Sequence, residues 1–159
     1  SKAGVIALLM YINRCTHTAK TKSNEFLFSL IKQYMDEGML TVIDLFNITQ
    51  LIAMVPSTRD LICEWIINYI DVKGYTVDSI CEKLGPEEAT LFVTVLLKHA
   101  PEIKDQSFLR LAEKILRNYN SVSHLTALDT YFIITKCKHF ETTVQKELAA
   151  IFFGKQMKW

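Results

Sequence analysis

The sequence predicts an all-α domain in which antiparallel helix pairs stack as a short α-solenoid, with a compact helical bundle as the alternative. Apolar residues recur at helical spacing through most of the 159-residue chain. With 5 glycines and 3 prolines, the chain has too few turn residues for a many-stranded β fold. Its hydrophobic content of 50% fills one core, so we expect a single domain over residues 1–159. Ser1 stands where a start methionine would be, which indicates a fragment of a larger protein.

The first half of the chain is predicted to hold four helices, over about residues 3–14, 23–36, 41–55 and 58–71. Ser23 and Asn24 are suited to cap the second helix, and Gly38 is suited to end it. The third helix is apolar at nearly every position and ends before Pro56, which has no N–H to donate within a helix. We therefore expect the third helix to be buried on most sides, and the fourth to be amphipathic and to end at Gly74.

The second half is predicted to hold five helices, over about residues 77–84, 87–99, 105–119, 123–138 and 141–153. Gly85 separates the first two, and Pro86 begins the next helix, because proline is favoured at the first helical position. The helix from residue 105 is the most regularly amphipathic part of the chain. The apolar helices are expected to supply the core, with almost complete burial of Phe46, Ile48, Leu51, Phe92, Leu96, Leu128 and Phe132.

Amphipathic helices alternate with nearly all-apolar ones, and this alternation predicts a repeated helix pair. The segment Leu40-Thr41-Val42-Ile43-Asp44 recurs as Leu125-Thr126-Ala127-Leu128-Asp129. A unit of about 40 to 45 residues follows, which is the size of a two-helix repeat. Helical bundles can produce such echoes through composition alone, which is the alternative explanation. The predicted units cover about residues 23–56, 57–101 and 105–140, with partial units at both ends.

An amphipathic helix, a tight turn and an apolar helix that begins Leu-Thr-x-x-Asp resemble the helix pairs of HEAT and armadillo repeats. The stretch from Phe108 to Leu148 is also similar to the helical repeats of FAST-kinase-like mitochondrial RNA-binding proteins. In those families the pairs stack into a solenoid that holds a protein or an RNA strand on its inner face. The resemblance implies a HEAT-like fold and this mode of binding.

The net charge of +1 hides an uneven distribution along the chain. Residues 1–24 carry four basic and no acidic residues, residues 25–105 carry 6 basic and 13 acidic residues, and residues 106–159 carry 8 basic and 4 acidic ones. Overall neutrality argues against a protein that mainly coats nucleic acid. The acidic centre suits a basic protein partner, whereas the basic last third suits RNA or an acidic partner.

Polar residues on the helices are the binding candidates. In the third helix, Asp44, Asn47 and Gln50 recur every three residues and share one face, as do Glu87, Thr90, Thr94 and Lys98 in the helix over 87–99. Such a stripe lines the groove if the pairs form a solenoid, and is a solvated edge otherwise. A polar stripe of the fourth helix contains three carboxylates that could face a basic partner: Asp60, Glu64 and Asp71.

The basic candidates lie in the last third of the chain, where they are either a solvated surface or a contact for RNA or an acidic partner. They are Arg110, Lys114, Arg117, Lys136 and Lys138.

No motif in the sequence predicts catalysis, a cofactor or a metal. The isolated glycines form no phosphate-binding loop, and the four cysteines contain no C-x-x-C pair. We expect the cysteines to be reduced, which favours cytoplasm, nucleus or mitochondrial matrix, and no apolar run is long enough to cross a membrane. The predicted function is a non-enzymatic intracellular scaffold that binds another protein. The alternatives are an RNA-binding helical-repeat domain and a helical bundle with a groove for a partner helix.

Overall fold

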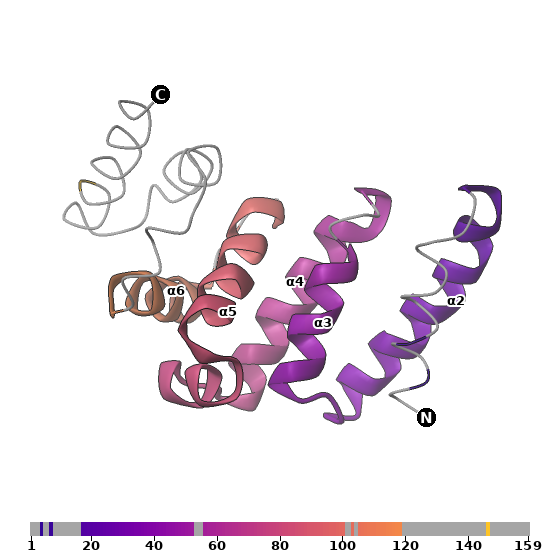
Figure 1. Ribbon diagram of the computed structural model, residues 1–159. Helices are drawn as coiled ribbons and strands as arrows, with labels where there is room; N and C mark the ends of the chain where they lie inside the picture. Colours follow the sequence, from indigo (N-terminus) through magenta and orange to yellow (C-terminus); the bar gives the residue numbers. More distant parts are fainter. Residues whose placement is uncertain are drawn as a thin grey trace.

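The computed structural model describes residues 17–52, 56–100, 103 and 105–118, together with Gly4, Ala7 and Lys146. All regular secondary structure in these residues is helical, so the all-α prediction is confirmed for this part of the chain. Figure 1 shows the helices side by side, with α2 at one end and α6 at the other. Their bounds are α2 His17–Asp36, α3 Val42–Ile52, α4 Pro56–Lys73, α5 Val77–His99 and α6 Gln106–Asn118.

Several predicted features lie outside the described residues. They are most of the helix over 3–14, the helices over 123–138 and 141–153 apart from Lys146, the second half of the unit 105–140, and the segment Leu125 to Asp129.

The start of α2 differs from the prediction. The helix begins at His17, so Ser23 and Asn24 lie inside it and do not cap it. Serine and asparagine in a helix interior cost at most about 0.7 kcal/mol relative to alanine. A favourable capping residue therefore does not force a helix to begin where it stands.

The predicted end of α2 at Gly38 is confirmed. Gly38 has a φ of 70°, and its N–H donates to the carbonyl of Met35 at 3.0 Å. The N–H of Met39 donates to the carbonyl of Tyr34 at 2.9 Å. These two bonds define a Schellman motif, which satisfies carbonyls that the helix leaves without a partner.

The end of α4 repeats this arrangement at Gly74, which has a φ of 67°. The N–H of Gly74 donates to Asp71 at 3.0 Å, and the N–H of Tyr75 donates to Ile70 at 3.1 Å. Both helices therefore end where the sequence predicts, through a glycine that takes the left-handed conformation without a Cβ penalty.

A threonine caps the start of the next helix after each of these turns. The N–H of Thr41 donates to Asp44 Oδ2 at 2.8 Å, and the N–H of Asp44 donates to Thr41 Oγ1 at 3.2 Å. Thr76 and Ser79 form the same reciprocal pair at 2.8 and 3.2 Å. Each pair is a capping box, so the connections after α2 and α4 are built in the same way.

Two prolines stand at helix starts. Pro56 is the first residue of α4, so this helix begins two residues before the predicted start at 58. Gly85, with a φ of 77° and a ψ of 167°, breaks α5 just before Pro86. The predicted separation of residues 77–84 from 87–99 is therefore confirmed as a kink, because a glycine with positive φ and extended ψ lets proline begin a new helical segment.

The core is drawn from all five helices, and Phe92 and Phe108 are its largest fully buried side chains, at 0% and 1% exposure. Among the residues predicted to be buried, Ile48, Phe92 and Leu96 are confirmed. The prediction is wrong for Phe46, which is only half-buried. Its ring lies 6.4 Å from that of Phe92 between centroids, so one side packs on the core and the other faces outward. The other predicted core side chains lie outside the described ones: Leu51, Leu128 and Phe132.

The expectation that residues 41–55 form a helix buried on most sides is also wrong for one face of α3. Ile43 is 48% exposed, and Asn47, one turn later, is exposed as well. Leu45 and Ile48 on the other side are completely buried. The helix is therefore covered on one face only, because only that face contacts its neighbours.

From α3 to α6, the helices contact both their neighbours in the chain and the next helix but one. Besides the consecutive contacts from α3 to α6, α3 packs against α5 and α4 packs against α6. The ammonium of Lys32 on α2 lies 5.5 Å from the ring centroid of Trp65 on α4, which brings these two helices together as well.

Candidate functional site

The outer face of α4 carries the three carboxylates that the sequence singled out. Asp60, Glu64 and Asp71 are all exposed, and we call these three residues the α4 acidic stripe. Spacings of four and seven residues place them on one side of the helix. The buried surface of the helix is formed by Ile62, Cys63, Ile66, Tyr69 and Ile70, and the buried Ile67 lies beside the stripe at the border of this surface. Tertiary packing therefore fixes the direction in which the carboxylates point.

Only one member of the α4 acidic stripe lies close to a cation among the described residues. Arg59 Nε is 3.6 Å from Asp60 Oδ1, which is long for an ion pair on a surface. In contrast, Asp36 on α2 has Lys32 Nζ at 2.6 Å. Glu64 and Asp71 present their charge to solvent, where a basic partner can reach them.

The three polar residues of α3 do not act as one set. The carboxylate of Asp44 is half-buried and accepts hydrogen bonds from the N–H and the hydroxyl of Thr41, at 2.8 and 2.9 Å. Asn47 is exposed. Gln50 is half-buried, and its Nε2 is enclosed without a hydrogen-bond partner among the described residues. Asp44 belongs to the capping box with Thr41, so its position is explained by the start of the helix and not by a binding stripe.

The polar stripe predicted for the second part of α5 is wrong at its two threonines. Thr90 and Thr94 are 3% and 2% exposed. Their hydroxyls donate to the carbonyls of Pro86 and Thr90 at 2.9 and 2.7 Å. A threonine that satisfies its hydroxyl one turn back in its own helix can be buried in an apolar face. These residues therefore line no groove.

The basic candidates are brought together in part. Arg110 and Lys114 are exposed and lie one turn apart on α6, opposite the buried Phe108, Ala112 and Ile115. The amphipathic character predicted for this helix is thus confirmed over its described side chains. The remaining basic candidates lie outside the described side chains: Arg117, Lys136 and Lys138.

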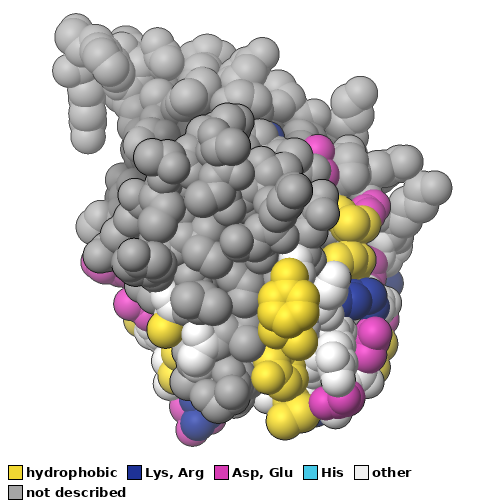
Figure 2. All heavy atoms as spheres, turned by 90° about the vertical axis from the view of Figure 1, so that its right-hand side faces the viewer, with side chains coloured by type: hydrophobic (Ala, Val, Ile, Leu, Met, Phe, Trp, Pro, Cys, Tyr) yellow, Lys and Arg dark blue, Asp and Glu magenta, His cyan; other side chains and the backbone are white. Residues whose placement is uncertain are grey.

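A column of hydrophobic side chains marks the side of the molecule on which α2 lies, with charged side chains beside it (Figure 2). Phe26 on α2 is 66% exposed, and Met39 just after this helix is 49% exposed. Leu30 and Tyr34 follow Phe26 at intervals of four residues and are partly buried. Exposed apolar residues are common on protein surfaces, so the column alone does not identify a partner.

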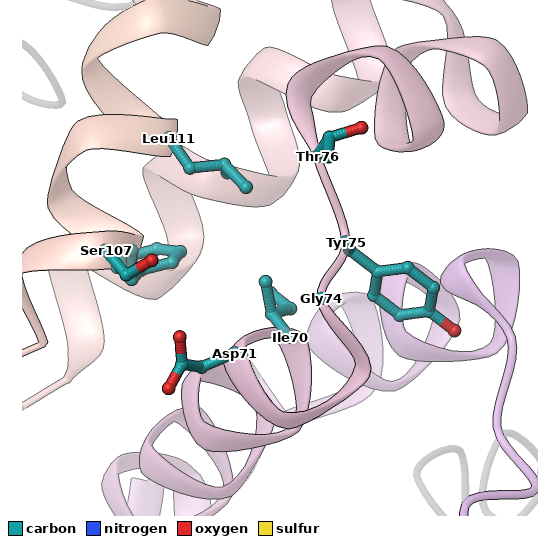
Figure 3. A pocket seen from close by; sticks show the side chains of 8 residues that line it. Ile70, Asp71, Gly74, Tyr75, Thr76, Ser107 and Leu111 are labelled. Atoms are coloured by element: carbon teal, nitrogen blue, oxygen red, sulfur yellow. The ribbon is translucent and has the colours of Figure 1, made fainter.

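A cavity of about 250 Å³, which the sequence does not predict, lies where the end of α4, its connection to α5 and the start of α6 meet. Figure 3 shows Ile70 and Leu111 reaching toward the space between these elements, whereas the Tyr75 ring turns away from it. Asp71 is the one charged residue among the described residues that line the cavity. The sequence identified Asp71 and the end of α4 at Gly74, but no pattern in it shows that α6 returns to this point.

Tyr69 has a shifted pKa. Burial raises the pKa of its hydroxyl above the ordinary value of 10.0, and the nearby Tyr75 raises it further. The hydroxyl bonds to the backbone of Leu40, at 2.9 Å from the N and 2.6 Å from the O. Because this hydroxyl both donates and accepts a hydrogen bond within the fold, we assign Tyr69 a structural role.

The described residues hold no group of three or more histidine, cysteine, aspartate or glutamate side chains placed to bind a metal ion. Cys63 is buried, Cys81 is half-buried, and neither is in a disulfide. None of the helices in the described ranges is long and apolar enough to span a membrane.

Comparisons of the chain with protein-family models, with curated proteins and with solved structures found no match.

Proposed function

We propose that this chain is a non-enzymatic, intracellular helical-repeat scaffold that binds a basic segment of another protein through the α4 acidic stripe. The exposed carboxylates of Glu64 and Asp71, for which the described residues provide no ion pair, carry the proposal. Charges at the surface of a complex chiefly accelerate association and select the partner. A partner with lysine or arginine at matching intervals would therefore be recognised by its charge.

The helix contacts support the stacked-pair architecture in this proposal. In a stack of helix pairs, the first helices of successive pairs lie next to one another, and so do the second helices. The packing of α4 against α6 and the Lys32–Trp65 contact between α2 and α4 fit the first row, and the packing of α3 against α5 fits the second. The α4 acidic stripe then lies on the outer surface of the middle helix of the first row, with the basic α6 next to it.

Three other acidic residues differ from Glu64 and Asp71 in having a local partner. Asp44 and Asp105 cap helices, with Asp105 Oδ1 accepting from the N–H of Phe108 at 3.1 Å. Asp36 is paired with Lys32. These three carboxylates cap a helix or pair with a lysine. Among the described residues, Glu64 and Asp71 have neither kind of partner.

Charge reversal tests the proposal. The probe is a fluorescent peptide of alternating lysine and alanine, and binding is measured by anisotropy at several salt concentrations. We expect the triple change Asp60→Lys, Glu64→Lys, Asp71→Lys to weaken binding by at least about tenfold. The matched control reverses three exposed carboxylates outside α4 and changes the net charge equally: Glu37→Lys, Glu82→Lys and Glu88→Lys.

Equal weakening by the two triple variants would show that the peptide responds only to net charge, and would overturn the role of the α4 acidic stripe. The same measurement with a single-stranded RNA addresses the alternative function. If the RNA binds at physiological salt and the peptide does not, the scaffold proposal is wrong. In that case Arg110 and Lys114, which share one face of α6, become the first residues to change.

A further inference from the structure

The cavity beside α4 combines an apolar wall with a single carboxylate. Ile70, Phe108 and Leu111 supply the wall and are at most 9% exposed. Asp71, on the same helix as Ile70, is exposed at the edge of the cavity (Figure 3). A ligand that enters therefore meets hydrocarbon inside and a negative charge at the rim.

The polar groups of the cavity are not all available to a ligand. The hydroxyl of Thr76 belongs to the capping box with Ser79, at 3.2 Å from its N–H. The hydroxyl of Tyr75 lies 3.3 Å from the carbonyl of Leu40, on the side away from the cavity. Asp71 and Ser107 are left, and both lie at the rim where α4 approaches α6.

This chemistry matches one kind of side chain. Lysine and arginine lay their methylene chains along apolar surface and keep the charged end in water or beside a carboxylate. An aliphatic side chain would fill the cavity but leave the charge of Asp71 unmatched, and an acidic side chain would be repelled by it. The volume of about 250 Å³ is large enough for one extended side chain.

We propose that this cavity holds the methylene chain of a lysine or arginine from the bound partner, with its charged end at Asp71. This inference rests on the proposed function, because it assigns a subsite to one end of the α4 acidic stripe. The stripe attracts basic segments by charge, and the cavity adds a requirement for the length of one basic side chain.

The test separates charge from chain length. The lysine–alanine peptide is compared with a peptide in which every lysine is replaced by diaminopropionate, which keeps a positive charge but lacks three of the methylene groups. We expect the short-chain peptide to bind on the order of tenfold more weakly, because apolar contact in the cavity is lost. The charge of the two peptides is matched by working at a pH where both kinds of side chain are fully protonated.

Two variants locate this preference. Ser107→Leu fills the cavity from α6 without changing the charge, so the two peptides should bind this variant with nearly equal affinity. Glu64→Gln removes a charge from the same stripe away from the cavity. It should weaken both peptides equally and leave their ratio unchanged. Circular dichroism of Ser107→Leu shows whether the helices are retained.

A second measurement keeps the test independent of that variant. In the unmodified protein, the amide signals of Gly74, Tyr75, Thr76 and Ser107 should shift in nuclear magnetic resonance spectra when the lysine peptide is added, and shift less with the short-chain peptide. If both peptides bind equally well and these amides do not move, the cavity is not a subsite, although the charge-based function stands. If neither peptide binds, the proposed function itself fails.

Discussion

The hydroxyl of Tyr69 and the backbone of Leu40 are joined by two hydrogen bonds. Leu40 N–H donates to the hydroxyl at 2.9 Å, and the hydroxyl donates to the carbonyl of the same residue at 2.6 Å. Tyr69 lies on α4, whereas Leu40 lies in the connection between α2 and α3. One side chain therefore satisfies both polar groups of a buried residue and fixes this connection against α4.

Removal of the Tyr69 hydroxyl should destabilise the fold. In Tyr69→Phe the N–H of Leu40 stays buried and loses its partner, so we expect the free energy of unfolding to fall by about 1 to 3 kcal/mol. Urea titration followed by circular dichroism measures this change. Tyr75→Phe is the control, because Tyr75 is only half-buried and bonds to the Leu40 carbonyl at 3.3 Å. Tyr75→Phe should lower the free energy of unfolding by less than Tyr69→Phe does. The reverse order would contradict the importance of the two hydrogen bonds between Tyr69 and Leu40.

The raised pKa of Tyr69 predicts a dependence of stability on alkaline pH. An unfolded tyrosine loses its proton near pH 10, whereas folded Tyr69 retains its proton to higher pH. The unfolded chain then binds fewer protons than the folded one, so stability falls as the pH rises through this range. Urea titrations between about pH 9 and pH 11 should show a steeper fall for the wild type than for Tyr69→Phe. If the stability of the two proteins fell in parallel with pH, burial would not raise the pKa of Tyr69.

The two glycines that end α2 and α4 form a matched pair for substitution. Both have φ near +70°, so alanine at either position should cost about 1 to 2 kcal/mol. A Cβ at Gly38 would stand 3.1 Å from Lys73 Nζ, whereas a Cβ at Gly74 would meet no atom within 4 Å. We therefore expect Gly38→Ala to cost at least as much as Gly74→Ala. Shortening Lys73 to alanine in the Gly38→Ala background should remove any excess, and unfolding free energies from urea titration decide the matter.

Burial predicts opposite results for two phenylalanines. Phe92 is completely buried, so Phe92→Ala should lower the free energy of unfolding by about 3 to 5 kcal/mol through the lost contacts and the resulting cavity. Phe26 is 66% exposed, and Phe26→Ala should change stability by less than about 0.5 kcal/mol. Thermal unfolding of both variants provides the comparison. A small loss for Phe92→Ala would show that α5 does not pack as described.

Helix ends could be predicted where they depend on a few adjacent residues. Gly38, Gly74 and Gly85 were identified from the sequence because a left-handed residue at a helix end is a local requirement. The prediction that Ser23 and Asn24 cap a helix is wrong, because both residues lie inside α2. Serine and asparagine are permitted inside a helix at little cost, so their meaning depends on the residues around them.

The candidate site could be predicted only where it depends on one helix. The α4 acidic stripe followed from the spacing of its residues, and all three carboxylates are exposed. The burial of Thr94 and the cavity beside Asp71 depend on which helices pack together. A single sequence shows which face of a helix is apolar, but it does not show that α6 starts beside the end of α4.

The contacts between helices next to one another or one apart also bear on how the chain folds. These contacts join helices close together in the chain order, so the loops that they close are shorter than in a fold that pairs distant segments. The hydrogen bonds of the two Schellman turns and of their capping boxes span only a few residues each, so these turns can form early. We therefore expect the described helices to assemble in about microseconds to milliseconds, as helical proteins of low contact order do.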